Sequence, residues 1–376
     1  MGTPITRDQL LQLRLAHHFP VSDGRPSSGL PGPAGVVDRM LAVQAQDFGQ
    51  ALWAVGSRVN GSTRQRVLAA LDSAEVVRSA PVRGTLHFVR PADLRWMLGL
   101  TAERMIKSAS RRLAELDLDQ RTLHRARDVA SEALAGGMAL SRDEFLDTLD
   151  RSGLSTSGQR GYHIIWYLAQ TQLVCWGPAD RSQQALVLLD DWAPDDSPRP
   201  DREEALRWFA LRYFTGHGPA RLQDFTWWSK LTLADAKVGL AQARSELVEY
   251  VYDGASYWAL PGVTEPDPMA GGGLLLAGYD EYILGYQDRA PSLPPEYASR
   301  IRLAKNGVFK PALLQDGRAV GTWRRNPREN MADIAPFAES AISGTEAFDG
   351  AITAYEHFLA DEPHARKPRE LNRTRG

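Results

Sequence analysis

The spacing of apolar residues predicts a chain that begins with helices. Leucines recur at helical spacing over residues 10–15, and apolar residues do the same over 36–43, with a Pro- and Gly-rich loop expected at 22–35. A further helix is expected over 64–71. Residues 76–89 then alternate as two short strands that turn near Pro81 and Gly84. Helices followed by a β-ribbon are typical of a winged helix.

The same order recurs twice along the chain. Residues 93–136 are strongly helical, and two more helices are expected before a second ribbon over 172–192. The first of these two helices opens with Ser141 and Glu144, which together form a capping box. A third pass runs from residue 202 to a hairpin whose Asp253-Gly254 step favours a type I′ turn. Three similar passes indicate tandem units.

The helical pattern weakens beyond residue 261. A linker is expected over 261–273, and strands over 274–286 and 306–325, with a turn at Asp316-Gly317. We therefore predict an α+β, mainly α fold with three tandem winged-helix units and a small C-terminal β-barrel. The expected divisions are 1–92 (with the glutamine motif described below), 93–197 (with preceding helices), 198–261, 262–360 and a disordered basic tail over 361–376.

Composition is consistent with an ordinary globular protein. Apolar residues make up 43% and charged residues 24% of the chain, and no apolar run is long enough to cross a bilayer. The N-terminal helix contains charges and lacks the apolar core of a signal peptide. We expect a cytoplasmic, nucleoid-associated monomer with no membrane partner. Cys175, the single cysteine, excludes an internal disulfide and is expected to pack in the core.

The net charge of −2 gives no overall sign of a nucleic-acid partner. The charges are nevertheless unevenly distributed, because residues 1–130 contain 18 Arg and Lys against 12 Asp and Glu. Such an asymmetry fits one basic face. Only six of the 44 basic residues are lysine, which fits either phosphate recognition or GC-rich coding.

Six segments, taken in order, resemble one known family. They are VQAQDFGQALWAVGSR, RGTLHFV, TSGQRGYHIIWYLAQTQLVCWGP, HGPARLQDFTWWSKL, GYDEYILGYQDR and VFKPALLQDGRAVGTWRR. Together they look like the winged-helix DNA glycosylase family of AlkZ-like proteins, typified by the azinomycin-resistance glycosylase, over roughly residues 8–360. The resemblance implies three winged helices in a C-shape with a C-terminal β-barrel, which enclose double-stranded DNA and excise N7-alkylated purines.

The family signature is a glutamine, an aliphatic residue and a second glutamine, and Gln44-Ala45-Gln46 matches it. A sister group with a broader range of monoadducts has aspartate at the last position. The resemblance therefore places this chain in the branch that unhooks interstrand crosslinks in antibiotic self-resistance, with Gln44 and Gln46 as the catalytic residues.

Two carboxamides suit this reaction because an N7-alkylated purine carries a positive charge and departs readily. Amide groups can orient a water at C1′ without acting as bases. Residues two apart on a helix point about 200° from one another, so we predict an irregular or extended turn at Gln44–Asp47, or a single catalytic glutamine. The alternative is an ordinary polar helix face. Asp47 is either a further catalytic carboxylate or a helix cap.

Other candidates come from the ribbons and the late hairpin. His87 is expected either to face the DNA cavity in support of catalysis or to lie in the core. Candidate DNA contacts are Arg83, Arg318, Arg324 and Arg325. Trp227-Trp228 is expected to pack in the core rather than to stack on bases. The scattered histidines predict no metal site, and nothing indicates a cofactor.

Two rival functions remain open at this point. A transcriptional regulator without catalytic activity would also use winged helices, although no dimerisation helix or strongly basic recognition helix is evident. An inactive, DNA-binding homologue is the other rival. For the glycosylase, a base tethered to both strands cannot swing into a deep pocket, so we expect a cleft open to solvent.

Overall fold

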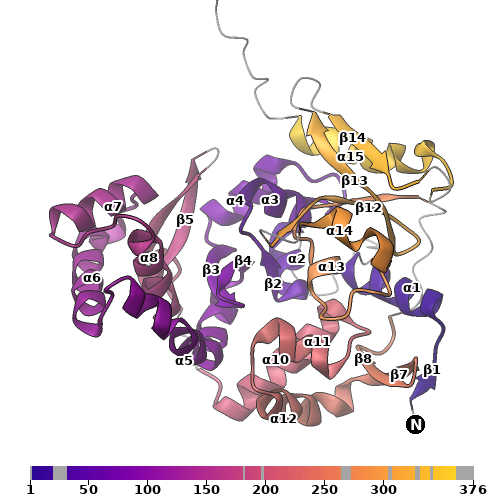
Figure 1. The fold of residues 1–376 in the computed structure, drawn as a ribbon, viewed down its shortest axis with the longest axis horizontal. Coiled ribbons are helices and arrows are strands. Elements are labelled where there is room, and N and C mark those ends of the chain that lie inside the picture. The colour runs from indigo at the N-terminus through magenta and orange to yellow at the C-terminus, as the bar shows by residue number, and fades with distance from the viewer. Residues whose placement is uncertain are drawn as a thin grey trace, which may run out of the picture.

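The computed structural model describes residues 2–19, 32–180, 183–195, 199–263, 272–303, 307–326, 331–338 and 342–360. Helices α6, α7 and α8 gather at one end of the molecule, and the C-terminal strands lie with α15 toward the other (Figure 1). The 361–376 tail and most of the 261–273 linker lie outside the described residues.

Helices dominate the first part of the chain, as predicted. They are α1 (Arg7–His18), α2 (Gly32–Met40), α3 (Phe48–Gly56) and α4 (Arg64–Asp72). The α2 helix ends earlier than expected, because Leu41 adopts a positive φ and the chain continues as a short strand, β2 (Ala42–Gln44). Helix α3 was not predicted separately. It begins at the N-cap Asp47, whose side chain accepts from the backbone of Gln50.

The first two ribbons share one sheet. Strands β3 (Val77–Val82) and β4 (Thr85–Val89) turn at Arg83 and Gly84, which both have positive φ. Strands β5 (Val174–Asp180) and β6 (Gln183–Leu188) form the second ribbon, and β3 pairs with β5, which gives the order β2-β4-β3-β5-β6. The first and second predicted units are therefore joined through their strands.

Helices α5 to α8 lie between the two ribbons in sequence. Their bounds are α5 (Pro91–Glu115), α6 (Gln120–Ala133), α7 (Arg142–Arg151) and α8 (Arg160–Gln170), and a short α9 (Leu189–Trp192) follows β6. The capping box predicted from Ser141 and Glu144 is present at the start of α7. Cys175 is completely buried, and burial raises the pKa of its thiol to about 12, as suits a core residue.

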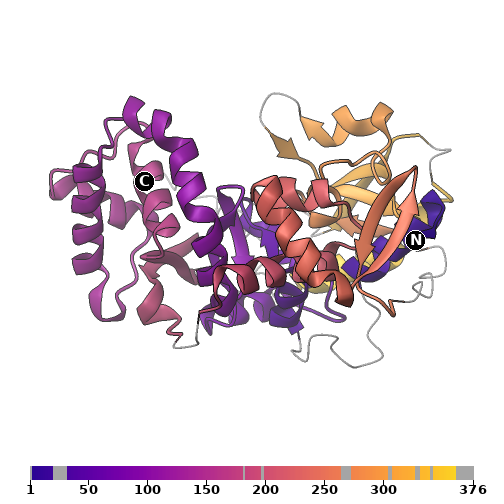
Figure 2. The ribbon, with the colours of Figure 1, turned by 90° about the horizontal axis from the view of Figure 1, so that it is seen from below.

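The third pass also follows the predicted order. It contains α10 (Arg202–His217), α11 (Leu222–Ser229), α12 (Leu233–Ala243), β7 (Val248–Tyr252) and β8 (Ala255–Ala259). The hairpin turns at Asp253 and Gly254 as expected. The strand β1 (Thr3–Pro4) extends this hairpin by pairing with β7, so the N-terminus packs against the third unit. Figure 2 shows this arrangement from below.

Three helices followed by a two-stranded ribbon thus occur three times in the described chain, as α2–α4 with β3–β4, α6–α8 with β5–β6, and α10–α12 with β7–β8. Their assignment as winged helices, and the four predicted division points, stay predictions.

The C-terminal strands form an open sheet, so the predicted closed barrel is wrong for the described residues. The sheet contains β9 (Leu274–Leu276), β12 (Ala312–Gln315), β13 (Arg318–Asn326) and β14 (Met331–Pro336) in the order β14-β13-β12-β9. Its edge strands β9 and β14 both contact α15 (Asp349–Leu359). Trp53 of α3 and Trp323 of β13 pack against Tyr355 of α15, so a helical layer buries the sheet's apolar face instead of a second layer of strands.

The strand expected over 274–286 is limited to its first three residues, because 277–286 contain no strand. After β9, Asp280 caps a short helix, α13 (Glu281–Leu284), by accepting from the backbone of Tyr282. Further short elements are α14 (Ala298–Ile301) and a pair of strands, β10 (Arg302–Leu303) and β11 (Val308–Phe309).

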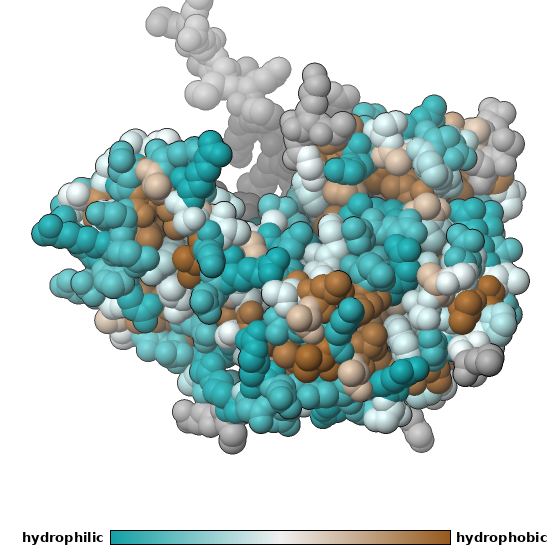
Figure 3. Space-filling model, turned by 60° about the horizontal axis from the view of Figure 1, so that its bottom comes forward, coloured by the Kyte–Doolittle hydropathy of each residue, from teal (hydrophilic) through white to brown (hydrophobic). Residues whose placement is uncertain are grey.

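Among the described residues, buried apolar side chains form several separate clusters. Viewed from the underside, polar and apolar groups are mixed, and the largest apolar area lies over α10–α12 (Figure 3). Exposed Leu233 and Val238 of α12 belong to this part of the chain. Among the described residues, no helix has the length and apolar character needed to cross a membrane.

The contact between α10 and the end of α2 yields a test of the packing. A Cβ atom on Gly216 would lie 2.6 Å from the backbone oxygen of Arg39 and 3.1 Å from the Cα of Met40. Because backbone atoms cannot yield as a side chain does, Gly216→Ala is expected to lower the free energy of unfolding by about 1–3 kcal/mol. Urea denaturation measures this change.

The matched control is Gly99→Ala in α5, where an added Cβ would meet nothing within 4 Å. This variant is expected to gain up to about 1 kcal/mol from helix propensity. Equal unfolding free energies for the two variants would contradict the packing of α2 on α10.

Candidate active site

The glutamine motif lies on an extended segment between two elements. Gln44 is the last residue of β2 and pairs in register with His87 of β4, whereas Gln46 and Asp47 lie in the bend before α3. The predicted irregular turn at Gln44–Asp47 is therefore confirmed, and the ordinary helix face is excluded. Gln44 is buried and Gln46 is exposed, so the pair spans the boundary between the core and the solvent.

The two glutamine side chains are joined directly. The Nε2 of Gln44 donates to the Oε1 of Gln46 over 2.7 Å. The Oε1 of Gln44 in turn accepts from Arg83 at 2.8 Å and from the hydroxyl of Thr85 at 3.3 Å. The polar atoms of Gln44 are therefore mostly engaged within the protein, whereas the Gln46 residue is exposed to solvent.

A buried carboxylate, Glu281, organises the side chains behind Gln44. Its Oε1 accepts from the backbone N–H of Gln44 at 3.1 Å and from Arg83 at 3.1 Å. Its Oε2 accepts from the indole N–H of Trp228 at 2.8 Å and lies 3.6 Å from the Nε2 of His217. Three parts of the chain far apart in sequence thus meet at one carboxylate. Sequence reasoning missed Glu281; the signal was an acidic residue inside a run of apolar ones.

The charge of Glu281 is retained in the core because Arg83 neutralises it. Burial opposes ionisation, but Arg83 and His217 outweigh it and hold the pKa of Glu281 well below its usual range. The two side chains form an ion pair that is 7% and 1% exposed. Removing either partner would leave an uncompensated buried charge, which is strongly destabilising.

The position of Arg83 follows from the tight turn between β3 and β4. Its φ of 56° places it in the left-handed region, which a non-glycine residue rarely adopts. Its Nη2 lies within hydrogen-bond distance of Gln44, Glu281 and His87. The structure directs this guanidinium inward, against the glutamine motif, and the predicted contact of Arg83 with DNA stays a prediction.

His87 is completely buried beside Arg83. Of the two positions expected for it, facing the DNA cavity or lying in the core, the structure shows the second. Its Nδ1 lies 2.7 Å from the carbonyl oxygen of Thr85 and its Nε2 lies 2.9 Å from Arg83. The arrangement requires an Nδ1–H that donates to the carbonyl and a bare Nε2 that accepts from Arg83. Burial and the neighbouring guanidinium accordingly lower the pKa of His87 to about 3.

These contacts fix the direction of the hydrogen bonds through the site. An arginine only donates, so the Gln44 oxygen must face Arg83 and its amide nitrogen must face Gln46. The oxygen of Gln46 must then be the atom that accepts the hydrogen bond from the amide nitrogen of Gln44. The amide orientations, which atom positions alone leave ambiguous, are thus set by the charge of Glu281 through Arg83.

The backbone of the motif is held by a second arginine. The Nε of Arg78 donates to the carbonyl of Ala45 at 2.8 Å, and its Nη2 donates to the carbonyl of Gln46 at 3.3 Å. Burial lowers the pKa of Arg78 to about 10. Sequence reasoning also missed this residue, which fixes an otherwise irregular bend. Asp47 acts as the N-cap of α3, the structural alternative considered for it.

The other predicted arginines lie on β13, away from these contacts. Arg318 forms an ion pair with Asp8 at 2.5 Å, and Arg324 forms one with Asp333 at 3.2 Å. Arg325 is exposed on the same strand. Arg318 and Arg324 are thus each paired with a carboxylate, and the role of all three arginines in DNA binding stays a prediction.

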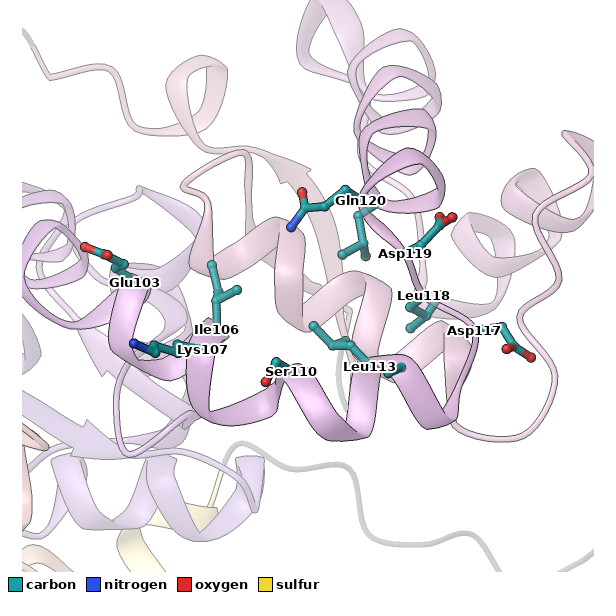
Figure 4. Close-up of a pocket in the computed structure, with 11 residues that line it drawn as sticks. Glu103, Ile106, Lys107, Ser110, Leu113, Asp117, Leu118, Asp119 and Gln120 are labelled. Carbon is teal, nitrogen blue, oxygen red and sulfur yellow. The ribbon is translucent and has the colours of Figure 1, made fainter.

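Other features of the described chain lie apart from the motif. A largely apolar cavity of about 950 Å³ is formed by α5 and the start of α6, with Ile106, Leu113 and Leu118 among its lining residues (Figure 4). It contains none of the predicted site residues. Within the described ranges, no group of three or more His, Cys, Asp or Glu side chains is arranged to hold a metal ion. Trp228 is fully buried in the core, as predicted, and Trp227 is partly buried.

Comparisons with known proteins agree on one family. A family model described as DNA glycosylase AlkZ-like matches residues 37–358. A curated protein of Streptomyces sahachiroi, the interstrand DNA cross-link repair glycosylase, is 26% identical over 328 residues, which cover 82% of this chain and 86% of that protein. The solved structure of Streptomyces sahachiroi DNA glycosylase AlkZ matches with a TM-score of 0.77 and 22% identity, covering 95% of this chain and 98% of that one.

The buried, neutral state of His87 predicts how stability depends on pH. The folded-state pKa of about 3 is far below the ordinary value of 6.5, so between these two values the unfolded chain binds a proton that the folded chain does not. Stability is therefore complete above about pH 6.5 and falls as the pH drops toward 3, by up to about 1.4 kcal/mol per pH unit for this group. His17, whose pKa is lowered to about 4, acts in the same direction.

Urea unfolding at several values between pH 7 and pH 4.5 measures this slope. In His87→Gln the loss of stability per pH unit should be smaller than in the wild type by about 1.4 kcal/mol. His124→Gln, at an exposed position on α6, is the control and should keep the wild-type slope. An unchanged slope in His87→Gln would show that His87 is protonated in the folded protein.

Proposed function

This chain belongs to the AlkZ-like DNA glycosylase family, and on that premise we propose that it hydrolyses the N-glycosidic bond of N7-alkylated purines in double-stranded DNA. We infer a monofunctional reaction, in which water rather than an enzyme amine attacks the sugar. The observation that carries this proposal is the hydrogen-bonded pair of Gln44 and Gln46, which an ion pair holds at the edge of the core.

The reaction needs a site that tolerates positive charge. An N7-alkylated purine departs with its own charge, and the sugar left behind resembles an oxocarbenium ion. A lone arginine near that sugar would oppose the reaction electrostatically. Here Glu281 pairs with Arg83, and His87 is neutral, so the arginine that contacts Gln44 does not present an unpaired charge to the sugar.

The geometry assigns different roles to the two glutamines. The oxygen of Gln44 already accepts from Arg83 and Thr85, so Gln44 positions its neighbour rather than the water. Gln46 is exposed, and its oxygen has one lone pair left after accepting from Gln44. We assign Gln46 to hold the hydrolytic water at C1′. Orientation of a water in this way replaces proton abstraction as the source of rate enhancement.

Interstrand crosslinks and bulky adducts are the proposed lesions. The S. sahachiroi relative is named for cross-link repair, and the second glutamine that marks this branch is present as Gln46. The exposure of Gln46 supports a site that can act on a base still tethered to the opposite strand. We further propose that a DNA-alkylating natural product forms the lesion, and that the protein is a cytoplasmic, nucleoid-associated monomer that confers self-resistance.

The family match favours a glycosylase over a transcriptional regulator. An inactive homologue is distinguished by an excision assay. The protein is incubated in excess with a duplex that contains one N7-methylguanine, and with a duplex crosslinked by an azinomycin-type agent. Abasic sites and separated strands are then quantified. Intact substrates after prolonged incubation would refute the proposed reaction.

Removal of the water-holding side chain should slow excision severely. Gln46→Ala is expected to reduce the single-turnover rate by about 100-fold or more, because the water loses its orientation. Its affinity for DNA should change little. The control is Gln65→Ala on the exposed side of α4, for which wild-type kinetics are expected. A Gln46→Ala enzyme as fast as the wild type would remove Gln46 from the mechanism.

The direction of the hydrogen bonds can be tested separately with Gln44→Glu. A carboxylate can still accept from Arg83 and Thr85, but it has no N–H to donate to Gln46. We expect excision about tenfold slower or more at pH 8. As the pH falls, protonation of the new carboxyl restores a donor, so the rate of the variant relative to the wild type should rise. A ratio independent of pH would contradict the positioning role of Gln44.

A further inference from the structure

Three cationic side chains surround one tryptophan next to the glutamine motif. Trp227 lies on α11, and its ring centre is 4.9 Å from the guanidinium carbon of Arg289. The Nζ of Lys230 is 5.6 Å from the same ring, and the guanidinium carbon of Arg83 is 5.5 Å from it. Arg83 also hydrogen-bonds to Gln44, so this cationic cluster adjoins the proposed catalytic pair.

Only one of the three charges is compensated. Arg83 pairs with Glu281, whereas neither Lys230 nor Arg289 has a carboxylate within salt-bridge distance among the described residues. The Nε of Arg289 donates to the backbone oxygen of Ile283 at 3.0 Å. Within the described chain, its terminal nitrogens and the Nζ of Lys230 have no acceptor. The Nη1 of Arg83 is buried and also has no partner.

Holding the cationic cluster in place costs the folded protein free energy. Lys230 ends α11 with a φ of 62°, a backbone conformation that disfavours any residue with a Cβ. Burial and repulsion from neighbouring arginines lower the pKa of Lys230, and the same causes lower that of Arg289 to about 10. The aromatic face of Trp227 recovers part of this cost through cation–π attraction. An anion bound by either side chain would recover more.

We propose that Lys230 and Arg289, each held against Trp227, bind phosphodiesters of the DNA strand adjacent to the nucleotide on which Gln46 acts. The site rests on the proposed function for its ligand, because a sugar presented to Gln46 has a phosphate on each side. A phosphodiester is a compact anion with several acceptor oxygens, and it matches the free donors of an ammonium and a guanidinium. Because neither residue contacts a base edge in this proposal, binding at the site is expected not to depend on the DNA sequence.

The arrangement also separates charge from chemistry. Arg83, whose charge is compensated by Glu281, contacts the glutamines. The uncompensated cations Lys230 and Arg289 lie against the ring of Trp227 instead. Each of the two cations is neutralised by the phosphodiester that it binds, so their charge does not oppose the developing sugar cation. The site therefore positions the strand and leaves the ion pair behind Gln44 intact.

Equilibrium binding to a 25-base-pair duplex with one N7-methylguanine tests the site, with the salt concentration varied. Lys230→Gln and Arg289→Gln should each weaken binding by about tenfold. Each lost phosphate contact should also reduce the slope of log affinity against log salt by about 0.9. Lys230→Arg keeps the charge and should restore most of the affinity. Lys230→Gly removes the charge but relieves the backbone conformation, so its weaker binding would not reflect misfolding.

The control is Lys237→Gln, at an exposed position on the neighbouring α12. If it lowers affinity and slope as much as Lys230→Gln does, or if Lys230→Gln and Arg289→Gln bind as the wild type does, the proposed site is refuted. The binding assay does not depend on catalysis. If the wild-type protein binds the duplex but never excises the base, the proposed reaction alone is refuted. If the wild type excises the base and the variants bind DNA as tightly as the wild type does, the phosphate site alone is refuted.

Discussion

The ion pair between Glu281 and Arg83 is the interaction on which the rest of the site depends. A carboxylate that is 1% exposed is retained in its charged form only where cations and N–H donors compensate for lost hydration. Here the compensation comes from Arg83, Trp228 and the backbone of Gln44. Because each of these groups belongs to a different part of the chain, the fold must be complete before the glutamine motif has its geometry. The site is thus a property of the whole molecule, although the sequence signature that points to it is only three residues long.

The scaffold around Glu281 explains why the turn before α13 is so firmly held. Arg58, which follows α3, forms a bidentate pair with Asp280, and Gln50 within α3 accepts from the backbone of Gly278. Helix α3 therefore anchors the turn that bears Glu281, while the same helix begins at Asp47, directly after the glutamines. Helix α3 thus contacts both the turn that bears Glu281 and the segment that bears the glutamines, which limits how far Glu281 can move relative to Gln44.

The parts of this arrangement that local patterns specify were predictable from the sequence, and the parts that depend on distant contacts were not. Helical spacing, the Ser141 capping box and the Asp253-Gly254 turn all act within a few residues, and the structure contains each of them. The family signature identified Gln44 and Gln46 but could not show that one is buried and the other exposed. The strand β2 and the helix α13 were missed because a positive φ at Leu41 and a cap at Asp280 interrupt patterns that otherwise continue. The closed barrel failed for a similar reason, since α15 covers a face that the strands alone would have had to bury.

Arg83 shows most clearly why residue type does not settle function. As an arginine in a ribbon turn it has the ordinary features of a DNA contact, yet its left-handed backbone directs the guanidinium toward Glu281. There it determines the amide orientation of Gln44 and, through it, that of Gln46. An arginine with an unpaired charge at this position would oppose a cationic transition state, whereas the paired one supplies direction without net charge. The same glutamine motif on a scaffold without Glu281 would therefore lack both the fixed amide orientation and the compensated charge of Arg83, and the three-residue signature alone would not provide the proposed chemistry.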